Sequence, residues 1–357
     1  MAFFELRDWR EGGERVATPL GTLFVRRQVE PRLPVLLLIH GFPSASWDFA
    51  PLWEPLSKQF SLLALDLLGF GDSAKPRGHR YSIAEQADLC EWLLRRDGAW
   101  EYHVLAHDYG DTVAQELLAR QLDKRKPRPA LRSVAFLNGG LFPETHRPRL
   151  VQRLLAAPLL GPLIARTTGK ARFAASLRAV FGKDTPPEPA VVDGLWSLLR
   201  TNDGHLALPR LLRYMAERRK QRARWVGALE KVPVPMAFVN GAADPVSGAH
   251  AAERWRELLG GDDLFELPGI GHYPQREAPE RTLEALMHFW SRHRLLGPVD
   301  PRPTVSITTR LSRSMSGSHR MALPTLALRW LPMIFTRAWS SRVWIAWSEA
   351  VRSASGA

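Results

Sequence analysis

The stretch Ala106-His107-Asp108-Tyr109-Gly110 decides the fold of this chain. It follows an apolar run at 102–105 and precedes a helix-like segment that begins at 112. Small residues two positions either side of a nucleophile, between a strand and a helix, are typical of a tight turn called the nucleophile elbow. This turn lifts its central side chain above the end of a sheet. The central residue is an aspartate rather than a serine, and that choice restricts the chemistry.

Short, continuous apolar runs recur along the chain, and polar or small residues follow each of them. The runs lie at 35–39, 61–65, 104–105, 133–137, 236–239 and 264–267. Continuous runs are typical of parallel strands covered on both faces, and helix-like stretches such as 83–96 and 280–294 alternate with them. The sequence therefore predicts an α/β fold with a mostly parallel sheet, helices on both faces, and ligands at the carboxyl ends of the strands.

Residues 145–230 interrupt this alternation, because they contain helix-like stretches and no clear strand. The insertion is too long for an ordinary loop. We therefore predict a helical cap at 145–230, placed between a first core part at 1–144 and a second core part at 231–298. Within the cap, single helices are expected at 149–165 and 206–224. Residues 299–357 are predicted to form a linker and a tail rich in tryptophan and arginine.

The formal charge of +13 does not by itself predict a nucleic-acid partner. Eight arginines and one acid in residues 301–357 carry +7 of this charge, so the rest of the chain is only mildly basic. The basic run 218–224 is predicted to be the solvated face of a helix. No zinc-finger spacing or aromatic-basic motif accompanies it. We expect no nucleic-acid partner, no metal ion and no organic cofactor.

The first residues are charged within five positions and lack a long apolar core, so they do not resemble a secretory signal. The single cysteine, Cys90, suits a reducing compartment, and we expect a cytoplasmic location. In the tail, Trp339, Val343, Trp347 and Val351 fall on one face of a predicted helix. Three interpretations of this stripe stay open: weak contact with a membrane surface, packing on the body of the protein, or no role.

Three chemically suited residues follow three of the apolar runs. Asp108 is in the elbow, Asp244 comes after the run at 236–239, and His272 lies in a small-residue loop after the run at 264–267. Nucleophile, acid and histidine is the chain order of catalytic triads built on this elbow. We expect His272 to face Asp108, and Asp244 to hold the other ring nitrogen of His272.

An aspartate nucleophile favours particular electrophiles. A carboxylate with an ordinary pKa near 4 is already ionised at neutral pH, so no base is needed for its attack. Attack on a carboxylic ester would give a reactive anhydride, whereas attack on an sp3 carbon with a strained oxygen or a halide gives a stable alkyl ester. His272 would then activate water to hydrolyse that ester. The backbone amides of Phe42 and Tyr109 are the expected oxyanion donors.

The motifs resemble those of the α/β-hydrolase superfamily, within the epoxide hydrolase and haloalkane dehalogenase group. The matching motifs are His40-Gly41-Phe42-Pro43, 66–73, His107-Asp108-Tyr109-Gly110, Asp244-Pro245 and Gly271-His272-Tyr273. A closer resemblance links the chain to the family of the mesoderm-specific transcript protein and its bacterial relatives. That resemblance rests on 106–111, 138–148, 202–204 and 224–229, and it leaves the tail unmatched. It implies an α/β-hydrolase fold with an inserted helical cap.

The resemblance also indicates the substrate. Dehalogenases of this group usually carry a tryptophan after the nucleophile and a second N–H donor for the halide, but here Tyr109 and Phe42 stand at those positions. Epoxide hydrolases use cap tyrosines to protonate the opening ring, which makes Tyr214, the single tyrosine of the predicted cap, the expected general acid. A haloalkane dehalogenase with Trp196 or Trp225 as a halide donor is the alternative.

The expected substrate is a small apolar molecule. The side chains expected to line its pocket are Trp47, Phe142 and Trp196. A third hypothesis belongs to a different class, namely a hydrolase-like scaffold that binds a ligand without catalysis.

Overall fold

The core of the protein is an eight-stranded sheet. The computed structural model describes residues 4–123 and 127–297. The strands are β1 (Gly13–Thr18), β2 (Gly21–Gln28), β3 (Val35–Ile39), β4 (Ser61–Leu65), β5 (Glu101–His107), β6 (Ala130–Leu137), β7 (Met236–Gly241) and β8 (Leu264–Leu267). Their order across the sheet is β1-β2-β4-β3-β5-β6-β7-β8. β2 pairs antiparallel with β1 and β4, and every other neighbouring pair is parallel. The prediction of a mostly parallel sheet is confirmed.

The register of the central strands brings their carboxyl ends together. Ile39 of β3 lies opposite Ala106 of β5, and His107 of β5 lies opposite Leu137 of β6. β4 is buried along its whole length, and β3 is buried in all but its first residue. Continuous burial explains why these strands have apolar residues without alternation. The loops that follow β3, β5 and β6 consequently meet at one edge of the sheet.

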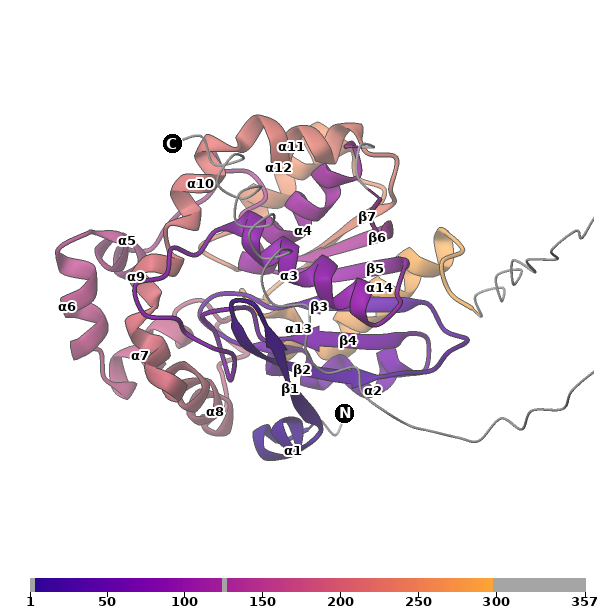
Figure 1. The fold of residues 1–357 in the computed structure, drawn as a ribbon. Helices are drawn as coiled ribbons and strands as arrows, with labels where there is room; N and C mark the ends of the chain where they lie inside the picture. Colours follow the sequence, from indigo (N-terminus) through magenta and orange to yellow (C-terminus); the bar gives the residue numbers. More distant parts are fainter. Residues whose placement is uncertain (1–3, 124–126, 298–357) are drawn as a thin grey trace, which may run out of the picture. The chain divides into compact units, whose positions relative to one another are not determined.

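Helices cover both faces of the sheet (Figure 1). The core helices are α1 (Leu6–Glu11), η1 (Ser46–Phe49), α2 (Ala50–Ser57), α3 (Ile83–Arg96), α4 (Tyr109–Arg120), α12 (Ala249–Leu259), α13 (Pro274–Glu277) and α14 (Pro279–Arg292). α3, α4 and α12 lie on one face, and α2 and α14 lie on the other. This layered arrangement leaves the strand ends as the place where loops can gather polar side chains.

The helix α3 shows how the local sequence sets an element. The hydroxyl of its N-cap residue, Ser82, accepts a hydrogen bond from the amide of Glu85 at 3.2 Å, which satisfies one amide of the first turn. Arg95 and Arg96 in the last turn complement the negative end of the helix dipole. Cys90 lies on the buried face of this helix. Its bounds coincide with the stretch predicted at 83–96.

A set of helices is inserted between β6 and β7, over the stretch predicted as a cap, and we refer to this insertion as the cap. These are α5 (Leu150–Ala156), α6 (Leu160–Thr167), α7 (Lys170–Arg178), α8 (Pro189–Arg200), η2 (Thr201–Leu206), α9 (Leu208–Leu211), α10 (Tyr214–Lys220) and α11 (Arg222–Lys231). The single helix predicted at 149–165 is instead two helices. Pro158 follows Ala157, whose ψ of 128° is extended, as expected for a residue before proline. The stretch predicted as one helix at 206–224 is likewise broken into η2, α9, α10 and α11.

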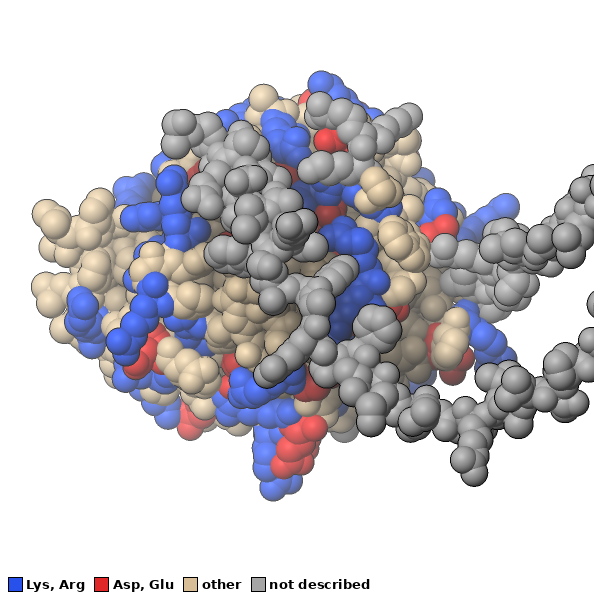
Figure 2. All heavy atoms as spheres, in the orientation of Figure 1, with Lys and Arg blue, Asp and Glu red and all other residues tan. Residues whose placement is uncertain are grey.

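The described surface is mixed in charge. Figure 2 shows lysine and arginine side chains spread over one face with acidic side chains among them, while the tip formed by α5 and α6 is largely uncharged. Within residues 4–123 and 127–297, no helix is long and apolar enough to cross a bilayer. The predicted tail, with its stripe of Trp339, Val343, Trp347 and Val351, lies outside the described residues.

Candidate active site

Asp108 stands on a strained turn between β5 and α4. Its φ of 47° and ψ of −103° lie outside the regions that ordinary residues favour. A side chain at Gly110 would overlap the carbonyl oxygen of Ile39, and one at Gly41 would lie 2.9 Å from Cβ of Asp108. Small residues are therefore required around the turn, as the elbow pattern predicts. The turn places Asp108 at the end of the sheet, where it is only 4% exposed.

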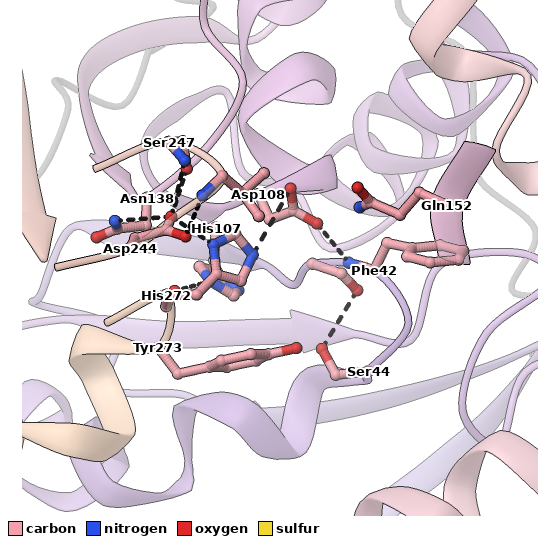
Figure 3. A network of polar contacts seen from close by, with 12 residues as sticks. Phe42, Ser44, His107, Asp108, Asn138, Gln152, Asp244, Ser247, His272 and Tyr273 are labelled. Atoms are coloured by element: carbon pink, nitrogen blue, oxygen red, sulfur yellow. Dashed lines mark hydrogen bonds and ion pairs between the residues drawn. The ribbon is translucent and has the colours of Figure 1, made fainter. Parts of the chain in front are cut away.

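The two carboxylate oxygens of Asp108 have different surroundings (Figure 3). Oδ2 accepts a hydrogen bond from the Phe42 amide at 3.0 Å. Oδ1 lies 3.9 Å from Nε2 of His272, which is too far for a direct hydrogen bond. Tyr109 is the first residue of α4, so its amide is one of the four that lack an acceptor within the helix. The two predicted oxyanion donors thus flank the predicted nucleophile.

His272 and Asp244 form a buried ion pair. Nδ1 of His272 lies 2.8 Å from Oδ2 of Asp244. Asp244 also accepts hydrogen bonds from the Val246 amide at 2.8 Å, and from the amide and hydroxyl of Ser247 at 3.1 Å and 2.7 Å. The Asn138 amide nitrogen is a further donor at 3.1 Å. The carboxylate is fixed from several sides, which holds the imidazole in one orientation.

These contacts shift the ionisation of the three groups. Burial disfavours charge on His272, but the charge of Asp244, its hydrogen bond and the charge of Asp108 together raise the pKa of His272 to about 9. Burial also disfavours charge on Asp244, but His272 and the hydrogen-bond donors lower its pKa to about 2. For Asp108, burial raises the pKa above its ordinary value, against the opposing effects of His272, the Phe42 amide and Arg218.

Two residues that sequence reasoning missed support the His272 loop. Glu277 accepts hydrogen bonds from the amides of Gly271 and Tyr273 at 2.9 Å, and from the amide of Gly182 in the cap at 2.7 Å. Asn138 joins Asp244 to the carbonyl of Gly241 through its amide nitrogen. An asparagine followed by two glycines at a strand end was the available signal for Asn138, whereas no local pattern marks Glu277.

His107 is a support rather than a reacting group. Its Nε2 donates to the carbonyl of His272 at 2.8 Å, and its ring is fully buried. Burial keeps the pKa of His107 well below its ordinary value, so it stays neutral. His40 braces the loop after β3 in a comparable way, since its Nε2 accepts from the Leu67 amide at 3.0 Å.

The structure brings Tyr214 toward the site but not the predicted pocket tryptophans. The Tyr214 ring lies 4.7 Å from the ring of Tyr109, and its hydroxyl is buried without a hydrogen-bond partner among the described residues. Trp47 donates to the carbonyl of Phe4 and packs under Arg276. Trp196 packs on Phe173 within the cap, at a ring distance of 5.5 Å. Phe142 is fully buried just beyond the strand end.

Two cap side chains that were not singled out also belong to this region. Gln152 of α5 points its amide end toward Asp108 (Figure 3). Arg218 of α10 belongs to the basic run predicted as a solvated face, and the prediction is wrong at this residue because Arg218 is 2% exposed. Arg219 and Lys220, which follow it, are exposed as predicted. In residues 4–123 and 127–297, no cluster of three or more His, Cys, Asp or Glu could hold a metal ion.

An elbow at the end of β5, a histidine–aspartate pair on later loops, and an inserted helical cap define a class of protein. The sequence model of the alpha/beta hydrolase family matches residues 36–285, and the chain belongs to that family. The predicted fold and family are confirmed.

Particular relatives narrow this assignment. The mesoderm-specific transcript homolog protein of Homo sapiens is 44% identical over 261 residues, which cover 71% of this chain and 78% of the relative. The LipZ protein of Mycobacterium tuberculosis is 40% identical over 282 residues, which cover 79% of this chain and 96% of the relative. Among solved structures, haloalkane dehalogenase DbeA from Bradyrhizobium elkani has a TM-score of 0.65 at 20% identity, covering 79% of this chain and 99% of its own. That likeness concerns the fold alone.

Proposed function

We propose that this protein is a hydrolase that opens an epoxide through a covalent alkyl ester on Asp108. One observation carries the proposal: Oδ2 of Asp108 is bound by the Phe42 amide, while Oδ1 faces an imidazole that Asp244 holds from behind. One oxygen therefore stays on a hydrogen-bond donor, and the other is free to attack. A carboxylate in this arrangement needs no base for its first step.

In the first step, Oδ1 of Asp108 attacks an epoxide carbon and the carbon–oxygen bond of the ring breaks. The released oxygen takes a proton from the hydroxyl of Tyr214. That hydroxyl suits the role because it is buried beside the nucleophile turn and has no acceptor among the described residues. The product of this step is a hydroxyalkyl ester of Asp108.

In the second step, His272 takes a proton from water, and the water oxygen attacks Cγ of Asp108. Oδ2 becomes the oxyanion and is held by the amides of Phe42 and Tyr109. The bond between Cγ and Oδ1 then breaks, so the diol leaves with Oδ1, while one water oxygen stays in the carboxylate. The proton on His272 passes to the departing alkoxide, and the water's other proton restores Tyr214.

Esterification prepares His272 for this second role. In the resting protein the charges of Asp244 and Asp108 raise the pKa of His272 to about 9, against the effect of burial. Forming the ester removes the charge of Asp108, so the pKa of His272 falls, its proton is released to solvent, and the neutral ring can act as the base. The proton returns from solvent when hydrolysis restores the charge of Asp108. The 3.9 Å between Nε2 and Oδ1 gives the imidazole a position near Cγ without a direct hydrogen bond to the nucleophile.

The contacts of the cap tryptophans favour an epoxide over a haloalkane as the substrate. The indole nitrogen of Trp225 donates to Glu116 at 2.8 Å, so it is engaged away from the nucleophile. Trp196 packs on Phe173 and Arg200 inside the cap. The N–H of Trp225 is therefore not available to a leaving halide.

Mass spectrometry of His272→Gln incubated with an epoxide tests the proposal. The variant is expected to accumulate an ester on the peptide that contains Asp108, because attack proceeds and hydrolysis does not. Asp108→Asn is the matched control and should not be labelled. A halide-release assay on haloalkanes separates the dehalogenase alternative, and Tyr214→Phe should slow epoxide opening alone.

One outcome would contradict the proposed hydrolase function. If no epoxide or haloalkane of the panel labels Asp108 in His272→Gln, and the unmodified protein turns none over, the non-catalytic binding scaffold becomes the better hypothesis.

A further inference from the structure

Four polar side chains near Asp108 have buried atoms without a hydrogen-bond partner among the described residues. The buried atoms without a hydrogen-bond partner among the described residues include both oxygens of Asp111, the hydroxyl of Tyr214, Nε and Nη1 of Arg218, and both ring nitrogens of His146. Asp111, Tyr214 and Arg218 are each at most 2% exposed. Buried polar groups in folded proteins are normally paired. A cluster of unpaired ones therefore points to a ligand.

The guanidinium of Arg218 is the only charged member of this cluster whose charge needs a partner. A side chain at Gly140 would overlap its Nη1, so the glycine after β6 leaves room for the guanidinium against the backbone. No ion pair joins Arg218 to an acidic side chain of the described residues. Its charge acts on Asp108 and Asp111, neither of which it reaches as an ion pair, and its guanidinium carbon lies 5.4 Å from the Tyr214 ring. Such a contact compensates only part of the desolvation of a buried charge.

The neighbouring acids do not supply the missing anion. Burial, together with the charge of Asp108, holds the pKa of Asp111 well above its ordinary value, which disfavours a negative charge on this group. Burial and the nearby cations lower the pKa of His146 to about 3, so this ring is neutral as well. Asp108 lies 3.9 Å from His272 and makes no ion pair with Arg218. The guanidinium of Arg218 is therefore left without a hydrogen-bonded anion among the described residues.

We propose that Arg218 binds a carboxylate of the substrate, so that the substrate is an epoxy acid rather than an apolar epoxide. The planar fork of an arginine matches a carboxylate through two parallel hydrogen bonds. A cation of the cap and a nucleophile of the core would then hold the two ends of a short molecule. This inference rests on the proposed function for the electrophile but not for the anion.

A titration with unreactive analogues tests the anion site without turnover. Cyclopropanecarboxylate has the shape of a small epoxy acid and lacks the electrophile, and cyclopropanecarboxamide is its neutral match. Calorimetry on the full chain should show the carboxylate binding about tenfold to a hundredfold more tightly. Arg218→Met should abolish that preference, and Arg218→Lys should retain part of it. Arg219→Met, the exposed neighbour on α10, is the control and should keep the preference.

The outcomes separate the two proposals. Equal binding of the two analogues, or a preference that survives Arg218→Met, overturns the anion site. Activity is then compared on glycidate and glycidamide. Turnover of glycidamide without any preference for glycidate supports the proposed function and rejects the anion site. A carboxylate preference in the titration, with no ester on Asp108 from either epoxide, supports the anion site and rejects the proposed function.

A second, independent observation concerns the outer surface of the cap. Five of the eight most exposed large apolar side chains of the described residues lie on or beside α5 and α6: Leu150, Leu154, Leu159, Leu160 and Leu163. Leu159 is 90% exposed. Figure 2 shows this tip as an uncharged area at the edge of the molecule. Contiguous exposed apolar side chains of this kind mark interaction sites.

The segment of chain that carries this tip is rich in cations. Between Glu144 and Asp184 the chain has eight lysines and arginines and no acid. One of these, Lys170, is paired with Asp193, and both partners are half exposed. An apolar tip with a cationic rim is the arrangement of protein elements that lie in the interface of an anionic bilayer.

We infer that the α5–α6 tip docks onto an anionic membrane surface. Flotation with vesicles tests this, using phosphatidylcholine alone and an equimolar mixture with phosphatidylglycerol. The full chain should float with the mixed vesicles and much less with the neutral ones. The double variant Leu159→Glu/Leu163→Glu should lose this binding, while Val29→Glu, which changes an apolar residue outside the cap that is 71% exposed, should not.

Three results would overturn the inference. The first is that the double variant floats as well as the unmodified chain, which assigns binding to another surface. The second is that neither protein floats. The third is that sedimentation shows self-association that the double variant loses, which makes the tip a contact between copies of the chain.

Discussion

Two buried charged side chains of the site, Asp244 and Arg218, differ in the polar partners that the fold provides for them. Asp244 is paired with His272 and accepts hydrogen bonds from Val246, Ser247 and Asn138. Arg218 has buried guanidinium nitrogens with no partner among the described residues. Leaving a buried charge without a partner is costly. The chain therefore completes the water-activating side of the site by itself and leaves the cap side to be completed by a ligand.

This difference separates the expected effects of substitution. Changes on the completed side remove a contact that exists throughout the reaction, so they act on the hydrolytic step. Changes on the open side remove a contact that forms only with substrate, so they act on binding and specificity. The largest effect should come from the completed side.

Asp244→Asn is expected to slow turnover by about 10⁴-fold, as in triads whose histidine loses its anionic partner. The charge that raises the pKa of His272 disappears, and the amide no longer fixes the ring. Formation of the ester on Asp108 should continue, so single-turnover mass spectrometry should find the ester accumulating in this variant. Ser247→Ala, which removes one hydrogen bond to the same carboxylate, is the control and should lose far less. A loss below tenfold in Asp244→Asn would contradict this role for Asp244.

The two sides also differ in how far the sequence could predict them. Asp108, Asp244 and His272 each follow an apolar run, and the strand order brings such positions together, so their grouping was predictable. Arg218 was not, because a basic run gives no sign of which member turns inward, and the room at Gly140 that admits it comes from another part of the chain. Whether a side chain such as Arg218 is buried depends on residues that are distant in the sequence.

Prediction of the strands and helices from the sequence is limited in the same way. β3 and β4 were predictable to the residue because both faces of these strands are buried. The hairpin of β1 and β2 was missed, because β1 is largely exposed and carries no continuous apolar run. Helix breaks within the cap depend on single residues such as Pro158, which helical periodicity over a long window does not register.

Glu116 extends the comparison to the contact between α4 and α11, where the fold again completes a buried charge. Glu116 is 5% exposed and accepts hydrogen bonds from Arg120, Arg224 and the indole of Trp225. Glu116→Gln is expected to lower the free energy of unfolding by about 3 kcal/mol, measured by urea denaturation, because it leaves the donors of Trp225 and Arg224 without their anion, while Arg120 keeps Asp88 and Glu91. A loss below ~1 kcal/mol would show that this contact adds no more than a surface pair does.

The pH dependence of this effect has a definite sign. Burial alone would raise the pKa of Glu116, but the hydrogen bonds from Arg224, Trp225 and Arg120 lower it below the ordinary value of 4.5. A group with a depressed pKa in the folded state stabilises the protein above its unfolded-state pKa. The difference between Glu116→Gln and the unmodified protein should therefore be full above pH 4.5 and shrink as the pH falls through the folded-state value.

The pKa of Asp108 provides a further test, because it depends on the charge of His272. Burial raises the pKa of Asp108, and the charge of His272 is the first of the effects that oppose the rise. The acid limb of ester formation should lie above pH 3.8 in the unmodified protein. In His272→Gln it should move to higher pH, because the opposing charge is gone. Rates of Asp108 labelling across pH measure both limbs, and an unchanged limb would mean that His272 carries no charge beside the resting nucleophile.

Glu144 gives the smallest expected effect and a matched contrast to Glu116. It too is held by two arginines, Arg222 at 2.6 Å and Arg254 at 3.3 Å, but its side chain is 34% exposed. The hydrogen bond from Arg222 is the main cause that lowers the pKa of Glu144 to about 2. Water and salt screen such a pair, so Glu144→Gln should lower the free energy of unfolding by less than about 1 kcal/mol, with most of that loss removed by high salt. Since both glutamates have the same kind of partners, a loss equal to that of Glu116→Gln would mean that burial is not what separates the two contacts.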